Sequence, residues 1–331
     1  GRQEQALASY HKALSLKPDY AEARVALAMA QIPVIYRQDD DPRVYRTEFT
    51  RELSELSAWF EVNGTDQAYQ SVGYQQPFYL AYQEYNNRKL LSRYGMLCSR
   101  LMERWNDKQE FPCSGIASTD ILRVGIVSAQ IRSHSVWDAI VKGWVRHIDR
   151  NRFELHVFHI GYRQDEETTW AKSHSAFFVQ GGKSLQQWVE AIVGGGLDVL
   201  IYPEIGMDPM TAKLAGLRLA PVQIAAWGHP ETTGLPTMDY YLSAEDFEPP
   251  NAQENYTEQL VPLPHLGCCY HPLPVTVSEP DFAGLGIDQE YPILLCPGAP
   301  FKYMPRYDRV LAEIARRVGK CTFVFFIHHF P

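Results

Sequence analysis

Three loops of this sequence combine histidine, carboxylate, glycine and hydroxyl residues, and each follows a short apolar run typical of a buried strand. In the first loop, residues 128–135, His134 could accept a proton or donate a hydrogen bond to a ligand hydroxyl. The same imidazole could instead cap a helix or simply be solvated. Its position in the sequence leaves both interpretations open.

The second loop, residues 202–208, holds two carboxylates four positions apart, Glu204 and Asp208. Either side chain could accept a proton or bind ligand hydroxyls, although Asp208 is also suited to cap a following helix. The third loop, residues 227–234, reads WGHPETTG. Its glycine, proline and threonine residues would let backbone amides approach a ligand closely.

Several well-known catalytic and nucleotide-binding motifs do not occur in the sequence. No GxGxxG follows the first predicted strand, and the GGKS string at 181–184 lacks the earlier glycine of a phosphate-binding loop. HExxH and GxSxG are also missing, which argues against metalloproteases and serine hydrolases. The six cysteines have no zinc-site spacing. None of these motifs therefore indicates a bound metal or organic cofactor.

The three loops require a scaffold that brings them to one edge. From residue 120 onward, short β-rich runs alternate with helical segments, which is typical of a parallel, doubly wound α/β sheet. The predicted strands are 121–128, 153–160, 197–202, 222–226 and 238–243, and the predicted helices are 136–149, 183–193 and 208–217. Such sheets bind ligands beyond the carboxyl ends of their strands, where all three loops would lie.

The N-terminal part has a helical pattern. Residues 1–40 carry alanines and a tyrosine at helical spacing, followed by Pro18, a pattern similar to the end of a tetratricopeptide repeat array. An ordinary amphipathic helical hairpin is the alternative. Residues 41–118 are predicted to be a helical linker region, and residues 119–275 an N-terminal Rossmann-like lobe.

The C-terminal part, residues 276–331, is predicted to be a crossover followed by the start of a second α/β lobe. Its predicted elements are a strand at 291–296, a helix at 305–318 and a strand at 321–327. A β-α-β unit of about 40 residues buries too little surface to form a domain. We therefore expect the second lobe to be incomplete, the natural protein to be longer, and these residues alone to be inactive.

Charge and composition restrict the partners. The net charge is −8 and the isoelectric point about 5.8, which argues against nucleic acid as a main partner. No apolar run approaches the roughly 20 residues of a membrane span. The first residues lack the plan of a secretory signal. We expect a cytoplasmic protein with reduced thiols and no membrane association.

A series of ordered stretches resembles the O-GlcNAc transferase family, glycosyltransferase family 41, from about residue 120 to 310. The stretches are LRVGIVS with His134, LRLAPVQ at 217–223, GHPETTG at 228–234, MDY at 238–240, YTEQL at 256–260 and FKYMP at 301–305. The resemblance implies a two-lobed (GT-B) fold. It also implies inverting transfer of a sugar from a nucleotide diphosphate donor, UDP-GlcNAc first among the candidates, to the side chains of a protein or peptide acceptor.

The resemblance also implies roles for individual residues. Lys302 would pair with the donor diphosphate and stabilise the leaving group without a metal, and His134 would lie near the sugar and the acceptor hydroxyl. The residues expected to bind the donor sugar are Gly228, His229, Pro230, Thr232 and Thr233, together with Glu204 and Asp208.

The chain also departs from the animal-type pattern of that family. His229 and Glu231 replace a tyrosine and a glycine of the sugar loop. Some stretches are similar to bacterial N-glucosyltransferases, and others to SPINDLY-type proteins, whose plant members use GDP-fucose. The donor therefore stays open among UDP-GlcNAc, UDP-glucose and GDP-fucose, and the acceptor between hydroxyl residues and asparagine. A tetratricopeptide scaffold with a degenerate lobe that only binds partners is the alternative outside the enzyme class.

Overall fold

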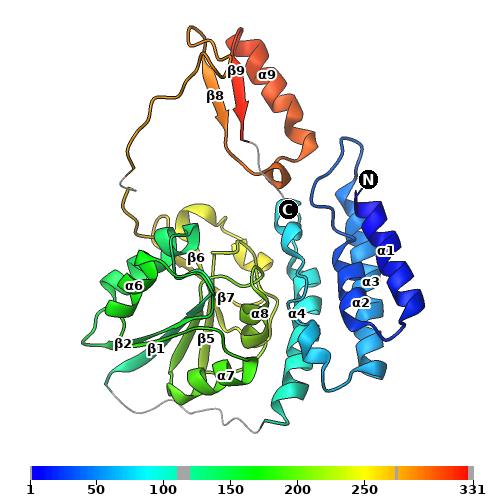
Figure 1. Cartoon of the computed structure of the whole chain (residues 1–331), viewed down its shortest axis with the longest axis vertical. Helices are drawn as coiled ribbons and strands as arrows, with labels where there is room; N and C mark the ends of the chain where they lie inside the picture. Colours follow the sequence, from blue (N-terminus) through cyan, green and yellow to red (C-terminus); the bar gives the residue numbers. More distant parts are fainter. Residues whose placement is uncertain (1, 110–119, 273–274, 327–331) are drawn as a thin grey trace.

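A computed structural model describes residues 2–109, 120–272 and 275–326. It shows a helical N-terminal region, a lobe built on a parallel sheet, and a small C-terminal β-α-β unit (Figure 1). The predicted boundary at residues 118 and 119 and the predicted strand end at 327 lie outside the described residues.

The helical region begins with two adjacent helices, α1 (Arg2–Leu16) and α2 (Ala21–Met29), joined by the short turn that contains Pro18. Helix α2 is buried along most of its length, whereas α1 buries no residue. The long helix α3 (Pro42–Asn63) starts with Pro42 behind Asp41, whose carboxylate accepts a hydrogen bond from the backbone of Arg43 at 2.9 Å. The tetratricopeptide identity of the first pair stays a prediction.

Helix α4 (Arg88–Asn106) joins the helical region to the sheet lobe. Its close approach depends on two glycines. A Cβ on Gly95 would lie 2.2 Å from the carbonyl oxygen of Gly234, and Gly234 itself has a φ of +69°. One buried core cluster accordingly includes side chains of α3, α4 and the sheet. The helical region and the lobe are packed as one body.

Within the described residues, seven strands form one sheet in the order β3-β2-β1-β4-β5-β6-β7, and every neighbouring pair is parallel. The strands are β1 (Leu122–Ser128), β2 (Phe153–His159), β3 (Phe177–Gln180), β4 (Val199–Tyr202), β5 (Val222–Ala226), β6 (Tyr240–Ala244) and β7 (Gln259–Leu263). The predicted doubly wound parallel sheet is confirmed. The chain order reverses between β1 and β4, the position at which such sheets bind ligands.

Helices cover both faces of the sheet. Along β1, Ile126 packs into one buried cluster and Val127 into the other, as alternating strand residues must. The first face is covered by a π-helical turn η3 (Trp137–Val141), α5 (Lys142–His147) and α6 (Glu166–Ser173). The second face is covered by α7 (Leu185–Gly194), α8 (Pro209–Ala215) and α4.

Three of these elements were not predicted: α6, β3 and β7. Strand β3 (FFVQ) is an edge strand of four residues with no buried position, and so short an apolar run is not told from a helical segment by its pattern. Strand β7 contains Pro262 at the edge of the sheet, where a missing amide donor is tolerated. The predicted helix at 136–149 is not one regular α-helix, because the π-helical turn η3 precedes α5 within it.

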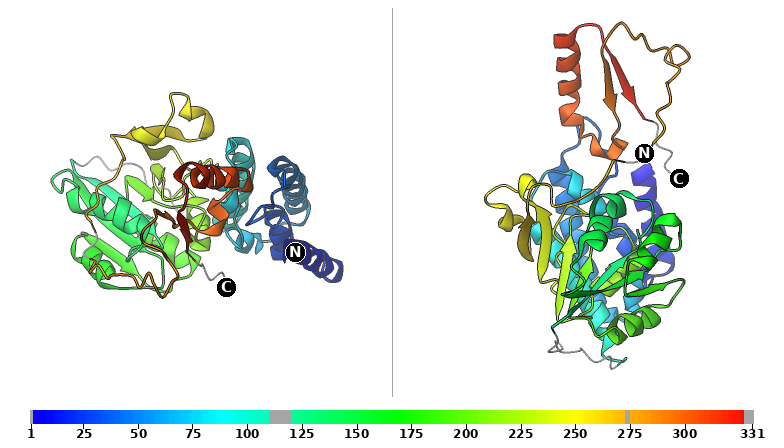
Figure 2. Two further views of the ribbon diagram at one scale, coloured as in Figure 1. Left: turned by 90° about the horizontal axis from the view of Figure 1, so that it is seen from above. Right: turned by 90° about the vertical axis from the view of Figure 1, so that its left-hand side faces the viewer.

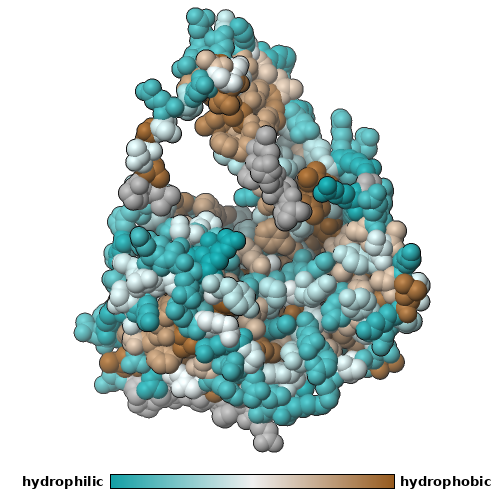
Figure 3. All heavy atoms as spheres, in the orientation of Figure 1, coloured by the Kyte–Doolittle hydropathy of each residue, from teal (hydrophilic) through white to brown (hydrophobic). Residues whose placement is uncertain are grey.

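The C-terminal unit has the predicted β-α-β order, with β8 (Ile293–Cys296), α9 (Asp308–Val318) and β9 (Thr322–Phe325). It stands clear of the seven-stranded sheet in Figure 1 and in the right-hand view of Figure 2. Its apolar side chains are poorly covered. Leu295 is 65% exposed and Phe325 52% exposed, and Figure 3 shows apolar atoms on this unit, facing the opening above the lobe.

Candidate functional site

The loop after β1 carries His134 directly before a helical segment. Its Nδ1 accepts a hydrogen bond from the backbone amide of Val136 at 3.2 Å, so the ring does cap the segment. Because Nδ1 is the acceptor, the neutral ring carries its proton on Nε2 and can donate it to a ligand. Partial burial, followed by the charge of Arg132, lowers the pKa of His134, which favours this neutral form.

The loop after β4 places Glu204 beneath the site rather than in it. The side chain is fully buried, and its oxygens accept hydrogen bonds from the Ser128 hydroxyl at 2.8 and 3.0 Å and from the Ala129 amide at 3.0 Å. Burial raises the pKa of Glu204 to about 8. The expectation that Glu204 contacts a sugar therefore does not fit its position, because it joins the ends of β1 and β4 instead.

Asp208 takes the second of the two roles that the sequence left open. It precedes α8, and its Oδ1 accepts hydrogen bonds from the amides of Met210 at 2.8 Å and Thr211 at 2.9 Å. These bonds satisfy two of the amide donors that every helix leaves unpaired at its start. Asp208 is a helix cap, with one of its two oxygens occupied in this way.

The loop after β5 lies directly against the loop after β4. The amide of Gly228 donates to the carbonyl of Pro203 at 3.0 Å, and a Cβ on Gly228 would lie 2.5 Å from that oxygen. His229 is buried, and its ring is stacked on Phe78 with centroids 5.1 Å apart and an interplanar angle of 22°. Burial lowers the pKa of His229 to about 4, so this imidazole is neutral near pH 7.

Pro230 and the two threonines differ in exposure. Pro230 is exposed, whereas Thr232 and Thr233 turn toward Glu258, a buried carboxylate next to β7. Glu258 accepts hydrogen bonds from the Thr232 hydroxyl at 2.5 Å and from the Thr233 amide at 2.8 Å, and it also accepts the Thr233 hydroxyl. The threonine side chains thus fix the loop through Glu258.

Glu231 connects this loop to the helical region. Its carboxylate accepts a hydrogen bond from the side-chain amide of Asn87, whose carbonyl oxygen is in turn bonded to Arg46 of α3. The second carboxylate oxygen of Glu231 is buried and has no hydrogen-bond partner among the described residues. Burial raises the pKa of Glu231 to about 7.

Lys302 lies at the end of a short 3₁₀ turn, η6 (Pro300–Lys302), and is exposed. The preceding residue, Phe301, packs against Tyr82 with ring centroids 4.9 Å apart, and against Tyr79 at 5.5 Å and Phe78 at 6.2 Å. Since Phe78 also stacks on His229, the segment with Lys302 and the loop after β5 meet on the same aromatic residue. These contacts connect the Lys302 segment with the loop after β5, but they do not include His134, so the convergence of all three loops with Lys302 stays a prediction.

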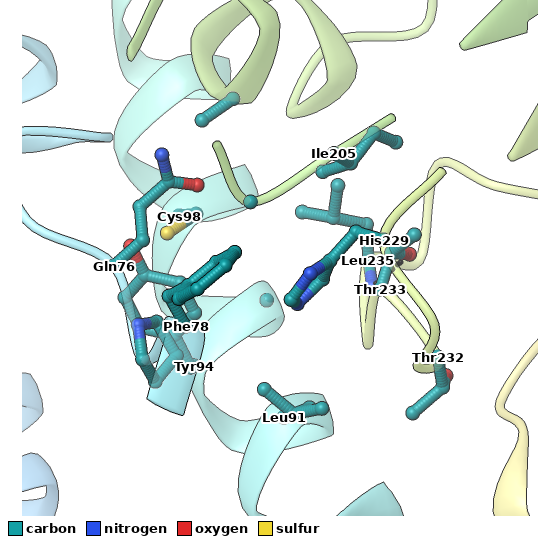
Figure 4. Close-up of a pocket in the computed structure, with 14 residues that line it drawn as sticks. Gln76, Phe78, Leu91, Tyr94, Cys98, Ile205, His229, Thr232, Thr233 and Leu235 are labelled. Atoms are coloured by element: carbon teal, nitrogen blue, oxygen red, sulfur yellow. Dashed lines mark hydrogen bonds between the residues drawn. The ribbon is translucent and has the colours of Figure 1, made fainter. Parts of the chain in front are cut away.

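Two hollows lie on either side of the loop after β5. The first is an apolar cavity of about 40 Å³ between this loop and α4, and Figure 4 shows the rings of Phe78 and His229 face to face within its lining. It has room for about one water, not for a sugar. The second is a polar hollow of about 340 Å³ lined by Asn87, Pro230 and Glu231 among others.

Sequence reasoning did not identify Glu258, Asn87 or Phe78 as parts of the site. Glu258 lies inside the YTEQL stretch that was recognised as a family motif, so a signal existed for it. The described residues contain no group of three His, Cys, Asp or Glu side chains that could hold a metal ion. Among the helices described, none has the length and apolar character needed to cross a membrane.

Comparisons with known proteins identify relatives of this chain. Among curated relatives, a probable UDP-N-acetylglucosamine–peptide N-acetylglucosaminyltransferase SPINDLY of Solanum lycopersicum is 31% identical over 160 residues, which cover 46% of this chain and 17% of that protein. A UDP-glucose:protein N-beta-glucosyltransferase of Actinobacillus pleuropneumoniae is 30% identical over 110 residues, which cover 32% of this chain and 17% of that protein. The chain thus matches about a sixth of the length of these relatives.

A solved structure shares the fold. An O-GlcNAc transferase mutant of Thermobaculum terrenum aligns with a TM-score of 0.56 and 18% identity, over 98% of this chain and 65% of that one. Residues 76–268, more than half of the chain, match glycosyl transferase family 41. The matched region contains the loops after β1, β4 and β5 together with Phe78 and Glu258. This chain therefore belongs to glycosyl transferase family 41.

Proposed function

We propose that this chain is part of a protein glycosyltransferase that transfers a sugar, with inversion, from a nucleotide diphosphate donor to protein side chains. The observation that carries the proposal is the meeting of the β1, β4 and β5 loops at the switch point of the sheet. Phe301, the neighbour of Lys302, packs on Phe78, which also stacks on His229 of the β5 loop. Family membership supports the reaction class. GlcNAc is the proposed sugar, and protein or peptide chains are the proposed acceptors.

The geometry suggests a role for each group. Departure of a nucleoside diphosphate builds negative charge, which the exposed Lys302 ammonium would stabilise. His134 would donate the Nε2 proton in a hydrogen bond to the sugar or the acceptor hydroxyl, since its Nδ1 is occupied by the Val136 amide. Gly228 and Pro230 would line the sugar pocket, and Thr232 and Thr233 would hold the loop in place through Glu258. In this proposal the reaction needs no metal.

The cysteines support a reducing location for the protein. Cys98, Cys268, Cys269, Cys296 and Cys321, which are the cysteines in the described part of the chain, are all free thiols. Free thiols are typical of the cytosol rather than of secreted proteins. We therefore propose a cytoplasmic enzyme.

Donor binding by the full-length protein tests the function. Thermal unfolding should be followed with UDP-GlcNAc, UDP-glucose or GDP-fucose present, because a donor at 100 times its Kd stabilises a protein by about 2.7 kcal/mol. Release of the nucleoside diphosphate with a peptide acceptor should then be measured for the donor that stabilises most. If no donor stabilises the protein and no nucleoside diphosphate is released, the alternative of a binding scaffold with a degenerate lobe is favoured.

A further inference from the structure

Phe78 lies between the two halves of the candidate site. On one side its ring is stacked on His229 of the loop after β5, at 5.1 Å between centroids and 22° between planes (Figure 4). On the other side it meets the edge of Phe301 at 6.2 Å and 76°. Stacked and edge-on pairs at these distances are the favourable geometries of aromatic rings. A single side chain of the helical region therefore contacts both halves.

The element that carries Phe78 is firmly anchored. It is the 3₁₀ helix η2 (Phe78–Tyr82), in which Leu80 is completely buried. The carbonyl of Leu80 accepts a hydrogen bond from the Asn87 side chain at 3.0 Å. The residue after η2, Gln83, is also completely buried, and its side-chain carbonyl accepts a hydrogen bond from Arg46 at 3.0 Å. These bonds tie η2 to α3 and to Asn87, the residue directly before α4.

The segment with Lys302 is held by the same element. Tyr79 and Tyr82 both meet the Phe301 ring edge-on, at 5.5 and 4.9 Å. Just beyond η2, Glu84 pairs with Arg306 and accepts a hydrogen bond from the Tyr307 hydroxyl at 2.6 Å. Contacts on both sides of Lys302 in the chain thus fasten residues 301–307 to the helical region.

Within the part of the chain that the structure describes, the ammonium group of Lys302 has no hydrogen bond or ion pair. A lysine side chain has many rotamers, and only its backbone position limits where the charge can go. That backbone position is set by Phe301, whose ring rests on η2.

We infer that Phe78 is a positioning residue, which sets the place of Lys302 relative to the loop after β5 by filling the space between His229 and Phe301. The inference rests on the proposed function, because it takes Lys302 as the group that stabilises the leaving diphosphate. Phe78 would act through Lys302 and would not touch the donor. The helical region would in this way determine the geometry of transfer through η2.

A double-mutant cycle in the full-length protein tests the inference. With the donor that stabilises the protein most, Phe78→Ala should lower kcat by roughly 10- to 100-fold, since a displacement of about 1 Å can cost that much. In a Lys302→Ala background the same substitution should cost less than about threefold, because the group it positions is gone. Equal losses in both backgrounds would overturn the inference.

Two further variants control the cycle. Phe301→Ala should reproduce the effect of Phe78→Ala, because it breaks the same contact from the other side. Tyr79→Phe removes only a hydroxyl and keeps the ring beside Phe301, so kcat should change less than about twofold. A loss of kcat in Tyr79→Phe as large as that in Phe78→Ala would also contradict a specific role for Phe78.

Hydrogen exchange separates this inference from the proposed function. The amides of Lys302 and Tyr303 donate to Ala299 and Pro300 at 2.9 and 3.2 Å, and both should exchange at least about tenfold faster in Phe78→Ala. Unchanged exchange over 299–304 would overturn the positioning role, whatever the activity. Faster exchange in a protein whose turnover does not respond to Lys302→Ala would support the contact but overturn the catalytic assignment of Lys302.

Discussion

The Ser128 hydroxyl donates a hydrogen bond to the Glu204 carboxylate at 2.8 Å and thereby joins the ends of two neighbouring parallel strands, β1 and β4. The two residues are 76 positions apart in the sequence. Because the β1 loop contains His134 and the β4 loop supports Gly228, this bond holds together the floor of the candidate site. It also places an ionisable group where water does not reach.

The first prediction concerns the pH dependence of stability at Glu204. Burial raises its pKa from 4.5 to about 8, so the folded protein binds a proton that the unfolded chain has released. The stabilisation is complete below about pH 4.5 and is lost as the pH rises through about 8, with a slope of at most about 1.4 kcal/mol per pH unit for one proton. Urea unfolding at several pH values should show that Glu204→Gln flattens this decline.

A matched variant makes the Glu204 result specific. Glu254→Gln changes an exposed carboxylate of the same lobe. In this variant the unfolding free energy should fall with rising pH as it does in the unchanged protein. If Glu204→Gln and Glu254→Gln had the same pH profile, the buried hydrogen bond to Ser128 would not be the source of the effect.

The second prediction separates the two roles of His134. His134→Ser keeps an acceptor for the Val136 amide, because serine is a good helix cap, but it removes the imidazole. We expect the melting temperature to change little and turnover to fall by roughly 10²-fold, the usual cost of losing one donor to the reacting groups. His134→Ala should lose similar turnover and also about 1 kcal/mol of stability. Full activity in His134→Ser would mean that His134 acts only as a helix cap.

The sequence predicted the architecture better than it predicted the contacts of the site. Strand β5 was predicted to the residue, and β1 and β2 to within one residue at an end, because buried parallel strands are continuous apolar runs. The edge strand β3 has an apolar sequence, FFVQ, but in four residues a strand is not told from a helical segment by pattern alone. Local pattern thus identified the central strands and missed this edge strand.

The partners of the loop residues could not be predicted from local pattern. Thr232 and Glu258 are 26 positions apart, and Asn87 and Glu231 are 144 positions apart. A string such as WGHPETTG shows which residues are available but not which of them are already bonded. For this reason the sequence assigned Glu204 to a ligand, whereas packing gives it to Ser128.

The third prediction concerns Glu258, the carboxylate that fixes the loop after β5. Glu258→Ala would leave the Thr232 and Thr233 hydroxyls and the Thr233 amide without their acceptor. We expect urea unfolding to show a loss of about 3 kcal/mol, because unsatisfied buried donors cost about 1–3 kcal/mol each and some relaxation will occur. Glu254→Ala, at an exposed carboxylate nearby, should cost less than about 0.5 kcal/mol. Equal losses of stability in Glu258→Ala and Glu254→Ala would contradict the conclusion that Glu258 fixes the loop.

The fourth prediction concerns the cation proposed for the leaving group. Lys302→Ala should lower kcat by roughly 10²–10³-fold, as expected when a group that meets developing charge is removed. Stability should be unaffected, because Lys302 is exposed. Lys320→Ala, which removes an exposed lysine of the same C-terminal unit, should keep full activity. If the unchanged protein shows no turnover and Lys302→Ala still binds the same partners, the chain would instead fit a binding scaffold.

The last prediction uses the difference between two buried carboxylates. Burial raises the pKa of Glu231 to about 7 and that of Glu204 to about 8, so both stabilise the fold most below about pH 4.5 and lose this contribution as the pH rises. Glu231 completes its loss near pH 7, whereas Glu204 continues to about pH 8. Glu231→Gln, which keeps an acceptor for Asn87, should therefore flatten the unfolding free energy only below about pH 7. Glu204→Gln should flatten the unfolding free energy up to about pH 8. If both variants flattened it over the same pH range, the assignment of different pKa values to Glu231 and Glu204 would be wrong.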